Sequence, residues 1–339
     1  MPPVKRNNPK RARSLESRYA VMEFLAEYPD DASCLDYLWR TLYSPDGVHY
    51  ECPACDELRT FHRVASRPLY SCAKCGKGIH PTKGTIFEKS STSLHLWFYA
   101  IYLMSSTRCG VSAKQLEREL GVTYKTAWRM FNKIRSLLGQ EDDEMFDGTV
   151  EMDEAYIGGQ AQWRSPARSK ALGIKGPGTS KKVPVMGMAQ RGTDGKSGKV
   201  HATVSKSRRM TWGEIAERVE VKVLPGSTVY TDESPLYAEV HRDGGYHHRR
   251  VNHNAKVYVS GDVHTNTIEG FWALLKGGIG GVYHSVSAKH LQSYLDEYVF
   301  RYNNRDVEGR GMFTAFLNRV FSDAEARLAP SETPSEAPS

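Results

Sequence analysis

Two Cys-x-x-Cys pairs constrain the fold of this chain more than any other feature. Cys52 and Cys55 form the first pair, and Cys72 and Cys75 form the second. Each such turn directs two thiolates at one metal, and the spacing of the two pairs matches a tetrahedral four-cysteine zinc site. Disulfides are disfavoured in a reducing cytoplasm, and a redox-active pair needs no second copy. The pattern therefore predicts one structural Zn2+ ion in a zinc ribbon over residues 49–88, because a metal stabilises a segment too short to bury its own core.

The two ends of the chain differ in composition from its middle. Residues 1–13 hold five basic and no acidic side chains, which predicts a disordered basic arm over residues 1–14 that lies along DNA. A tail that only aids solubility fits equally well. Residues 15–48 are expected to form a short helical region. Residues 329–339 are rich in Pro, Ser and Glu, and a disordered tail is predicted over residues 323–339.

Charge and hydropathy narrow the class of protein. A net charge of +7 and a pI near 9.0 favour a polyanionic partner such as nucleic acid, although a basic enzyme with another substrate has the same balance. The longest uncharged stretch, residues 90–107, is shorter than the roughly 20 apolar residues of a spanning helix. The N-terminus lacks the apolar segment of a secretory signal. We therefore expect a cytoplasmic protein without a membrane segment, in which the uncharged stretch forms a buried helix.

A helix-turn-helix pattern lies within residues 89–140. Ser112 is expected to cap a first helix that packs Leu116 and Leu120 inward, Gly121 to make the turn, and Thr123 to cap a second helix. Helical hairpins that bind no DNA are also common, so the neighbouring cysteine pairs and basic arm strengthen the interpretation. The residues expected to contact DNA from the start and outer face of the second helix are Tyr124, Lys125, Thr126 and Arg129. Those expected to face the core are Ala127, Met130, Phe131 and Ile134.

Beyond about residue 146 the hydrophobic pattern changes to short extended runs followed by helices. Strands are predicted at 150–157, 183–190, 199–204 and 228–231. Helices are predicted at 212–219, 267–276, 288–302 and 311–321. This order is typical of an RNase H-like α/β domain, which we place at residues 146–322, although other α/β folds share parts of it.

Three acidic residues stand in separate motif-like contexts in this region: Asp153 in V-E-M-D-E-A-Y-I-G-G, Asp232 in V-Y-T-D-E-S and Glu269 in H-T-N-T-I-E-G-F-W. Strand alternation puts Glu151 on the same face as Asp153 and Glu154 on the other, which disfavours Glu154 as a ligand. Asp232 ends a strand, and Glu269 lies in the first turn of a helix. Three converging carboxylates can hold two divalent cations for in-line phosphoryl transfer, and Mg2+ prefers such oxygen ligands.

Basic side chains surround these acids in the sequence. Residues 155–193 contain no acid, and this glycine-containing stretch is expected to form a flexible loop that holds DNA phosphates near Asp153, with a merely solvated loop as the alternative. Its candidate DNA-binding residues are Arg164, Arg168, Lys170, Lys175, Lys181 and Lys182. Histidines between residues 241 and 264 fit no metal-ligand spacing, so phosphate contacts by Arg249 and Arg250 are the favoured interpretation there.

Several motifs occur together in one order over about residues 35–320. They are C-P-x-C, C-x-x-C, an apolar L-x-x-W-F-x-A helix, D-E-A-Y-I-G-G, T-D-x-S-x-x-Y and H-T-N-T-I-E-G-F-W-x-x-L-K. In this combination the chain resembles the zinc-ribbon insertion-sequence DDE transposases of the ISXO type. The resemblance implies that Asp153, Asp232 and Glu269 hold two Mg2+ or Mn2+ ions. It also implies that Lys276 contacts the transposon end, with His264 and Asn266 belonging to the same DNA-binding motif.

The same resemblance implies a function. A bacterial, nucleoid-associated transposase of this type binds the terminal inverted repeats of its element and catalyses metal-dependent DNA cleavage and strand transfer into target DNA. Two ends of double-stranded DNA have to be joined in concert, so a homodimer or larger assembly is expected on DNA. One alternative is a domesticated, non-catalytic DNA-binding protein that uses only the zinc ribbon and the helix-turn-helix. A second is a related metal-dependent nuclease such as a junction resolvase.

Overall fold

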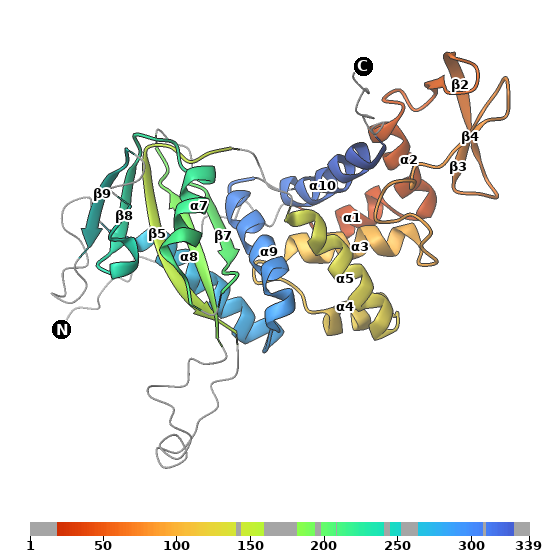
Figure 1. Cartoon of the computed structure of the whole chain (residues 1–339). Helices are drawn as coiled ribbons and strands as arrows, with labels where there is room; N and C mark the ends of the chain where they lie inside the picture. The colour runs from red at the N-terminus through yellow and green to blue at the C-terminus, as the bar shows by residue number, and fades with distance from the viewer. Residues whose placement is uncertain are drawn as a thin grey trace, which may run out of the picture. The chain divides into compact units, whose positions relative to one another are not determined.

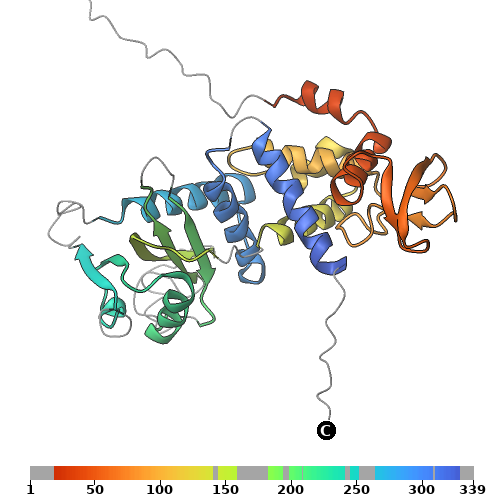
Figure 2. The ribbon, with the colours of Figure 1, turned by 90° about the horizontal axis from the view of Figure 1, so that it is seen from above.

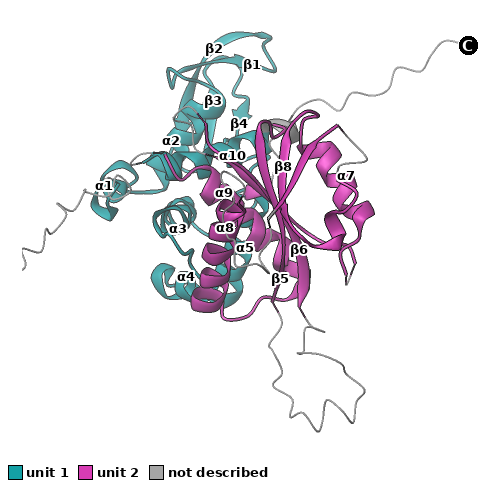
Figure 3. Ribbon diagram, turned by 90° about the vertical axis from the view of Figure 1, so that its left-hand side faces the viewer, with its two compact units in different colours: residues 1–137, 307–339 teal, residues 138–306 magenta. Residues whose placement is uncertain are grey.

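The computed structural model describes residues 19–139, 144–158, 182–193, 198–207, 209–240, 245–251, 264–307 and 310–328. The chain divides into two compact units (Figure 3). Unit 1 combines residues 1–137 with residues 307–339, and unit 2 comprises residues 138–306. Among the helices described, none is both long and apolar enough to cross a membrane.

Aromatic side chains hold the helices of unit 1 together. Its N-terminal helices are α1 (Val21–Glu27) and α2 (Asp31–Leu42), and α3 (Leu94–Ser106) packs against α10 (Gly311–Leu328) (Figure 1). The ring of Tyr28 lies 5.2 Å from that of Phe98 on α3 and 5.8 Å from that of Phe313 on α10, and all three residues are buried. The uncharged stretch therefore forms a buried helix, as predicted, because its large apolar side chains find partners on both flanking helices.

A small antiparallel sheet follows α2 in unit 1. Its strands, in the order β1-β2-β3-β4, are β1 (His49–Cys52), β2 (Glu57–Val64), β3 (Leu69–Cys72) and β4 (Gly78–Ile79). Trp39 of α2 covers one side of this sheet, and its ring stacks on Tyr70 of β3 at a centroid distance of 4.3 Å. The sheet thus has only a small apolar core of its own, which fits a segment that depends on a metal.

Two short helices come next, α4 (Ala113–Leu120) and α5 (Tyr124–Leu138). The Ser112 hydroxyl accepts a hydrogen bond from the backbone N–H of Gln115 at 3.2 Å, and Gly121 ends α4 in the left-handed region at φ 64°. Both features are those predicted, because a serine satisfies an orphan N–H at a helix start and glycine has no Cβ to strain this turn. The six side chains predicted to face the core, Leu116, Leu120, Ala127, Met130, Phe131 and Ile134, are all buried.

Unit 2 is built on a mixed five-stranded sheet. Its order is β7-β6-β5-β8-β9. The strands are β5 (Thr149–Ile157), β6 (Val183–Gln190), β7 (Val200–Val204), β8 (Thr228–Asp232) and β9 (His247–Val251). β5, β6 and β7 pair antiparallel, whereas β8 runs parallel to both β5 and β9. β5 and β8 therefore run in the same direction, and β8 ends at Asp232 beside the middle of the longer strand β5.

Helices cover both faces of this sheet (Figure 2). On one face α7 (Trp212–Lys222) packs Ile215 and Val219 against Met152 and Met188 of the sheet. On the other face lie α8 (Asn266–Gly278) and α9 (Leu291–Asn303), joined by η3 (Ile279–Tyr283) and η4 (Ala288–His290). Because strand side chains alternate, β5 presents Val150 and Met152 to α7, and Glu151 and Asp153 to α8.

The four strands and four helices predicted for this half of the chain are confirmed within a few residues. β9 was not predicted, because its sequence, H-H-R-R-V, is almost entirely polar and lies at a sheet edge. The predicted catalytic segment 146–322 includes most of α10, which the structure places in unit 1. Similarly, α10 continues to Leu328, so the first residues of the predicted tail are helical, and Ala324 is fully buried. The basic arm and residues 329–339 lie outside the described residues.

Candidate active site and metal centre

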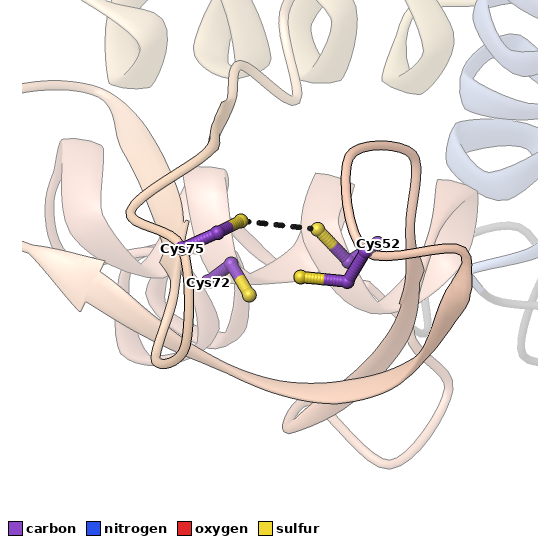
Figure 4. Close-up of side chains that lie close together, drawn as sticks. Cys52, Cys72 and Cys75 are labelled. Carbon is purple, nitrogen blue, oxygen red and sulfur yellow. Dashed lines mark hydrogen bonds between the residues drawn. The ribbon is translucent and has the colours of Figure 1, made fainter.

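The sulfur atoms of the two Cys-x-x-Cys pairs converge in unit 1 (Figure 4). The four Sγ atoms of Cys52, Cys55, Cys72 and Cys75 all lie within 4.8 Å of one another, and those of Cys52 and Cys75 are 3.6 Å apart. Ligands about 2.3 Å from a tetrahedral zinc ion are separated by about 3.8 Å, so the cluster has suitable dimensions for a structural metal such as zinc. Backbone N–H groups of Cys75 and Lys74 lower the pKa of Cys72 to about 7, whereas the neighbouring Cys75 thiol raises that of Cys55.

Asp153 is the central acid of unit 2. It lies on β5 opposite Gly187 of β6, and its Oδ2 accepts a hydrogen bond from the indole Nε1 of Trp272 on α8 at 3.0 Å. Burial is the main cause that raises its pKa to about 7, and the negative charges of Glu154 and Asp232 add to the effect. A carboxyl group whose pKa is raised toward 7 by burial and like charges is typical of a functional site. A cation placed there offsets the electrostatic cost of ionising the group.

Asp232 ends β8 next to Asp153. The parallel register pairs Glu151 with Tyr230, so the next same-face positions along the two strands are Asp153 and Asp232. Oδ1 of Asp232 accepts a hydrogen bond from the backbone N–H of Ser234 at 2.9 Å, which fixes the start of the following turn. The strand register therefore places two carboxylates side by side, where β8 ends next to β5.

The turn after Asp232 is tied to β5 through the opposite face of the sheet. Tyr237, in η2 (Pro235–Tyr237), is fully buried and donates its hydroxyl to Oε2 of Glu154 at 2.6 Å. Burial and this carboxylate raise the pKa of Tyr237 well above its usual value, and burial also raises the pKa of Glu154. Glu154 thus points away from α8, as the strand pattern predicts, and its partner explains the spacing of the T-D-x-S-x-x-Y motif.

Glu269 lies in the first turn of α8, where the sequence predicts it. Its side chain is exposed, and Oε1 accepts a hydrogen bond from the Thr265 hydroxyl at 2.9 Å. Trp272 follows one turn later on the same side of the helix and reaches Asp153. Lys276 comes one further turn along and is also exposed. One edge of α8 therefore carries an acid, the indole that contacts Asp153 and a lysine.

A second buried acid, Glu151, lies beneath the start of α8. Its Oε1 accepts a hydrogen bond from Nε of Arg191 at 2.7 Å, and Nη2 of the same arginine donates to both Nδ1 and the carbonyl oxygen of His264 at 2.8 Å. Because Arg191 donates to Nδ1 of His264, that ring nitrogen is assigned as an acceptor. It lies 3.3 Å from Oε1 of Glu151, and the guanidinium of Arg191 contacts both atoms. Strand alternation placed Glu151 on this face, but nothing in the sequence indicated its partners.

Asp153 and Asp232 are neighbours, and α8, which carries Glu269 in its first turn, contacts Asp153 through Trp272. Within the described parts of the chain, the four cysteines are the only group of three or more potential ligands whose atoms lie within 4.8 Å of one another. Glu269 accepts its hydrogen bond from the hydroxyl of Thr265, the residue that precedes α8.

The predicted DNA-binding residues that the structure describes are mostly at the surface. Tyr124, Lys125 and Arg129 of α5 are exposed, and Thr126 is half-buried. In unit 2, Lys182, Arg249, Arg250, Asn266 and Lys276 are exposed, and His264 is partly exposed. The remaining members of the predicted basic loop, Arg164, Arg168, Lys170, Lys175 and Lys181, lie outside the described residues.

Unit 1 also contains an open polar groove that sequence reasoning did not identify. It has a volume of about 700 Å³ and lies between the β2–β3 hairpin and the segment that precedes α3. Its basic lining residues are Arg63, Arg67, Lys83 and Lys89, and several serine and threonine hydroxyls lie among them. Of its two acids, Asp31 is engaged by the backbone N–H of His95 and Glu88 by that of Gly84.

Comparison with known proteins assigns the family. Residues 145–303 match the ISXO2-like transposase domain. The chain is also 31% identical, over 265 residues, to an uncharacterized protein in transposable element ISH50 of Halobacterium salinarum, a match that covers 76% of this chain and 85% of that protein. The chain belongs to the ISXO2-like transposase family, as the sequence motifs predicted. Its DDE transposase domain is that of a polynucleotidyl transferase. Because this relative comes from a haloarchaeon, a bacterial origin stays a prediction.

A solved structure with detectable similarity is the simian T-cell lymphotropic virus intasome in complex with the PP2A regulatory subunit B56 gamma. The match has 12% sequence identity, covers 71% of this chain and 78% of that chain, and has a TM-score of 0.26. Similarity at this level is too low to support a conclusion about fold or function.

Proposed function

We propose that this protein is a DNA transposase that binds the terminal inverted repeats of an insertion sequence and catalyses metal-dependent DNA cleavage and strand transfer. We further infer that unit 2 is an RNase H-like catalytic domain. One observation supports the proposal: in a chain of a transposase family, Asp153 and Asp232 occupy neighbouring positions on parallel strands, and α8, which carries Glu269, contacts Asp153 through Trp272. Separate chain segments thus supply the carboxylates that phosphoryl transfer requires.

The metal ligands in this proposal are Asp153, Asp232 and Glu269. Their oxygen donors suit Mg2+ or Mn2+. Burial, followed by the negative charges of Glu154 and Asp232, raises the pKa of Asp153, and a cation would favour its ionised form. Two such cations, when bound, would activate the attacking water or DNA 3′ hydroxyl and stabilise the leaving oxygen. Carboxylates arranged in this way require no covalent enzyme intermediate.

The side chains around these acids orient them. The Trp272 indole N–H donates a hydrogen bond to Oδ2 of Asp153 and so orients this carboxyl group. The backbone N–H of Ser234 does the same for Asp232. The Thr265 hydroxyl donates a hydrogen bond to Oε1 of Glu269 and so orients this side chain. Each acid therefore has at least one hydrogen bond before DNA or metal arrives, which lowers the cost of assembling the site.

DNA contacts are proposed for both units. The exposed side chains of α5 suit the recognition helix of a helix-turn-helix, and the polar groove of unit 1 offers four cations and several hydroxyls to a phosphate backbone. Lys276, one helical turn beyond Trp272, would contact the DNA end next to the acids. A structural zinc ion held by the cysteine cluster would keep the ribbon folded, and at least a homodimer would bring two ends together.

The experiment separates chemistry from binding. Asp153→Asn, Asp232→Asn and Glu269→Gln are each expected to abolish Mg2+-dependent cleavage at the element's 3′ ends while leaving gel-shift affinity for those ends close to wild type. Glu233→Gln is the matched control, because Glu233 is the exposed neighbour of Asp232 and should cleave normally. Equal loss of binding and cleavage in all three variants would instead indicate structural roles for the acids. If the wild-type protein itself binds the ends but does not cleave them, it is a non-catalytic DNA-binding protein.

A further inference from the structure

Glu151 is a fully buried carboxylate that the proposed chemistry does not use. It lies on β5 two positions before Asp153, on the same face. Besides Arg191 and the nearby His264, its hydrogen-bond partners lie at the start of α8. Oε2 accepts hydrogen bonds from the backbone N–H groups of Thr267 at 2.7 Å and Ile268 at 3.0 Å, and Oε1 accepts one from the Thr267 hydroxyl at 2.9 Å.

These contacts make Glu151 the cap of α8, supplied by another element. The first backbone N–H groups of a helix have no partner within it, and they attract negative charge. The residue that precedes α8, Thr265, makes no capping hydrogen bond, because its hydroxyl is engaged with Glu269 instead. The carboxylate of Glu151 therefore satisfies the helix start from the strand that carries Asp153.

The position of Glu269 relative to Asp153 depends on this connection. β5 holds α8 at two points, through Glu151 at the first turn and through the contact of Asp153 with Trp272 in the second. Glu269 lies between these two points on the same helix. Arg191 adds a third connection, because its guanidinium also lies 4.7 Å from the ring centroid of Tyr230 on β8, the strand that ends in Asp232.

We propose that Glu151 is a positioning residue that sets the distance between Glu269 and the pair formed by Asp153 and Asp232. This inference rests on the proposed function. It assigns Glu151 to a role distinct from metal binding, since its two oxygens are already directed at α8, Arg191 and His264. The start of α8 is then fixed relative to β5, and this sets the position of Glu269 relative to Asp153 and Asp232.

The test is Glu151→Gln in the full-length protein. A glutamine has nearly the same shape but replaces one acceptor oxygen by an N–H2 group, which faces donors on every side. We expect the Mg2+ concentration for half-maximal cleavage to rise about 10- to 100-fold, the range found when groups that orient metal ligands are removed. Amide hydrogen exchange at Thr267 and Ile268 should rise in the absence of DNA and metal. Wild-type exchange in α8, or reduced cleavage with an unchanged Mg2+ requirement, would overturn the proposal.

Two further variants keep the test decisive. Glu297→Gln is the matched control, since Glu297 is equally buried and also pairs with an arginine, Arg301, but lies on α9. It should lose stability without changing the Mg2+ requirement. Thr267→Val removes one donor to Glu151 and keeps the backbone contact, so it remains informative if Glu151→Gln does not fold. It should shift both readouts in the same direction by less, and no shift would contradict the proposal.

The outcome also separates this proposal from the proposed function. If the wild-type protein shows no metal-dependent cleavage, the catalytic function is wrong, and the exchange measurement still reports whether Glu151 holds α8. If cleavage is present and depends on Asp232, but Glu151→Gln leaves α8 exchange at the wild-type rate, only the positioning role fails.

Discussion

Substituting Gly187 by alanine tests the contact between α8 and the strand beside Asp153. Gly187 pairs with Asp153 across β5 and β6 and lies directly under the helix. A Cβ atom built on Gly187 would overlap the Trp272 ring and lie 2.7 Å from Cδ1 of Ile268. Carbon atoms pack best at about 3.5–4.0 Å, so α8 would have to move by roughly 1 Å.

That displacement gives two magnitudes. Overpacking of this kind costs about 1–3 kcal/mol of stability, whereas a shift of about 1 Å in a catalytic arrangement costs about 100-fold in rate. We therefore expect Gly187→Ala to remain folded at 25 °C and to lose about two orders of magnitude in Mg2+-dependent cleavage per folded molecule. The assay is single-turnover cleavage of a labelled element end, with the folded fraction taken from urea unfolding.

The control is Gly213→Ala on α7, because a Cβ there would meet no atom within 4 Å. It should retain full cleavage and unfold at a slightly higher urea concentration, since alanine favours a helix over glycine. Full activity in Gly187→Ala would refute the reasoning that close packing of α8 on β6 sets the geometry of the acids.

Three more perturbations follow from the structure. Chelating the metal expected at the cysteine cluster, or Cys72→Ser, should release about one Zn2+ ion per chain and increase amide exchange across β1 to β4, which mass spectrometry measures. Without Mg2+, Asp153→Asn should stabilise the protein at pH 8 by at most about 4 kcal/mol but not at pH 4, because the pKa of Asp153 is raised by burial from 3.8 to about 7 and the stability from its bound proton is lost as pH rises through 7. Urea unfolding at both pH values checks this sign. Tyr237→Phe should lower the free energy of unfolding by about 1–3 kcal/mol, because it removes the hydrogen-bond donor to half-buried Glu154. An unchanged unfolding midpoint would contradict this prediction.

Local patterns in the sequence were sufficient to predict most of the helices and strands of the second half of the chain, with β9 as the exception. The serine at position 112 and the glycine at position 121 act within a few residues of themselves, so the ends of α4 could be predicted from chain chemistry alone. The alternation along residues 150–157 likewise separated the faces of β5, and the contacts of Glu151 and Glu154 agree with that separation. Such features depend on neighbours close in sequence.

Features that depend on distant neighbours could not be predicted in this way. The partners of Glu151 on α8 lie more than a hundred positions along the chain, and no periodicity links a strand carboxylate to a particular helix start. The need for glycine at position 187 appears only when α8 is placed on β6. Among the strands that the structure describes, β9 pairs only with β8, and it is polar, so its pattern does not distinguish an edge strand from a loop.

The central claim is that Asp153, Asp232 and Glu269 carry out DNA strand transfer. The most direct measurement is an in vitro strand-transfer assay with the element's own terminal repeats, a supercoiled target plasmid and Mg2+, followed by sequencing of the junctions. We predict that the wild-type protein joins the 3′ ends of the element to the target, and that Asp232→Asn binds the repeats but forms no junctions. Junctions formed by Asp232→Asn at the wild-type rate would contradict the account.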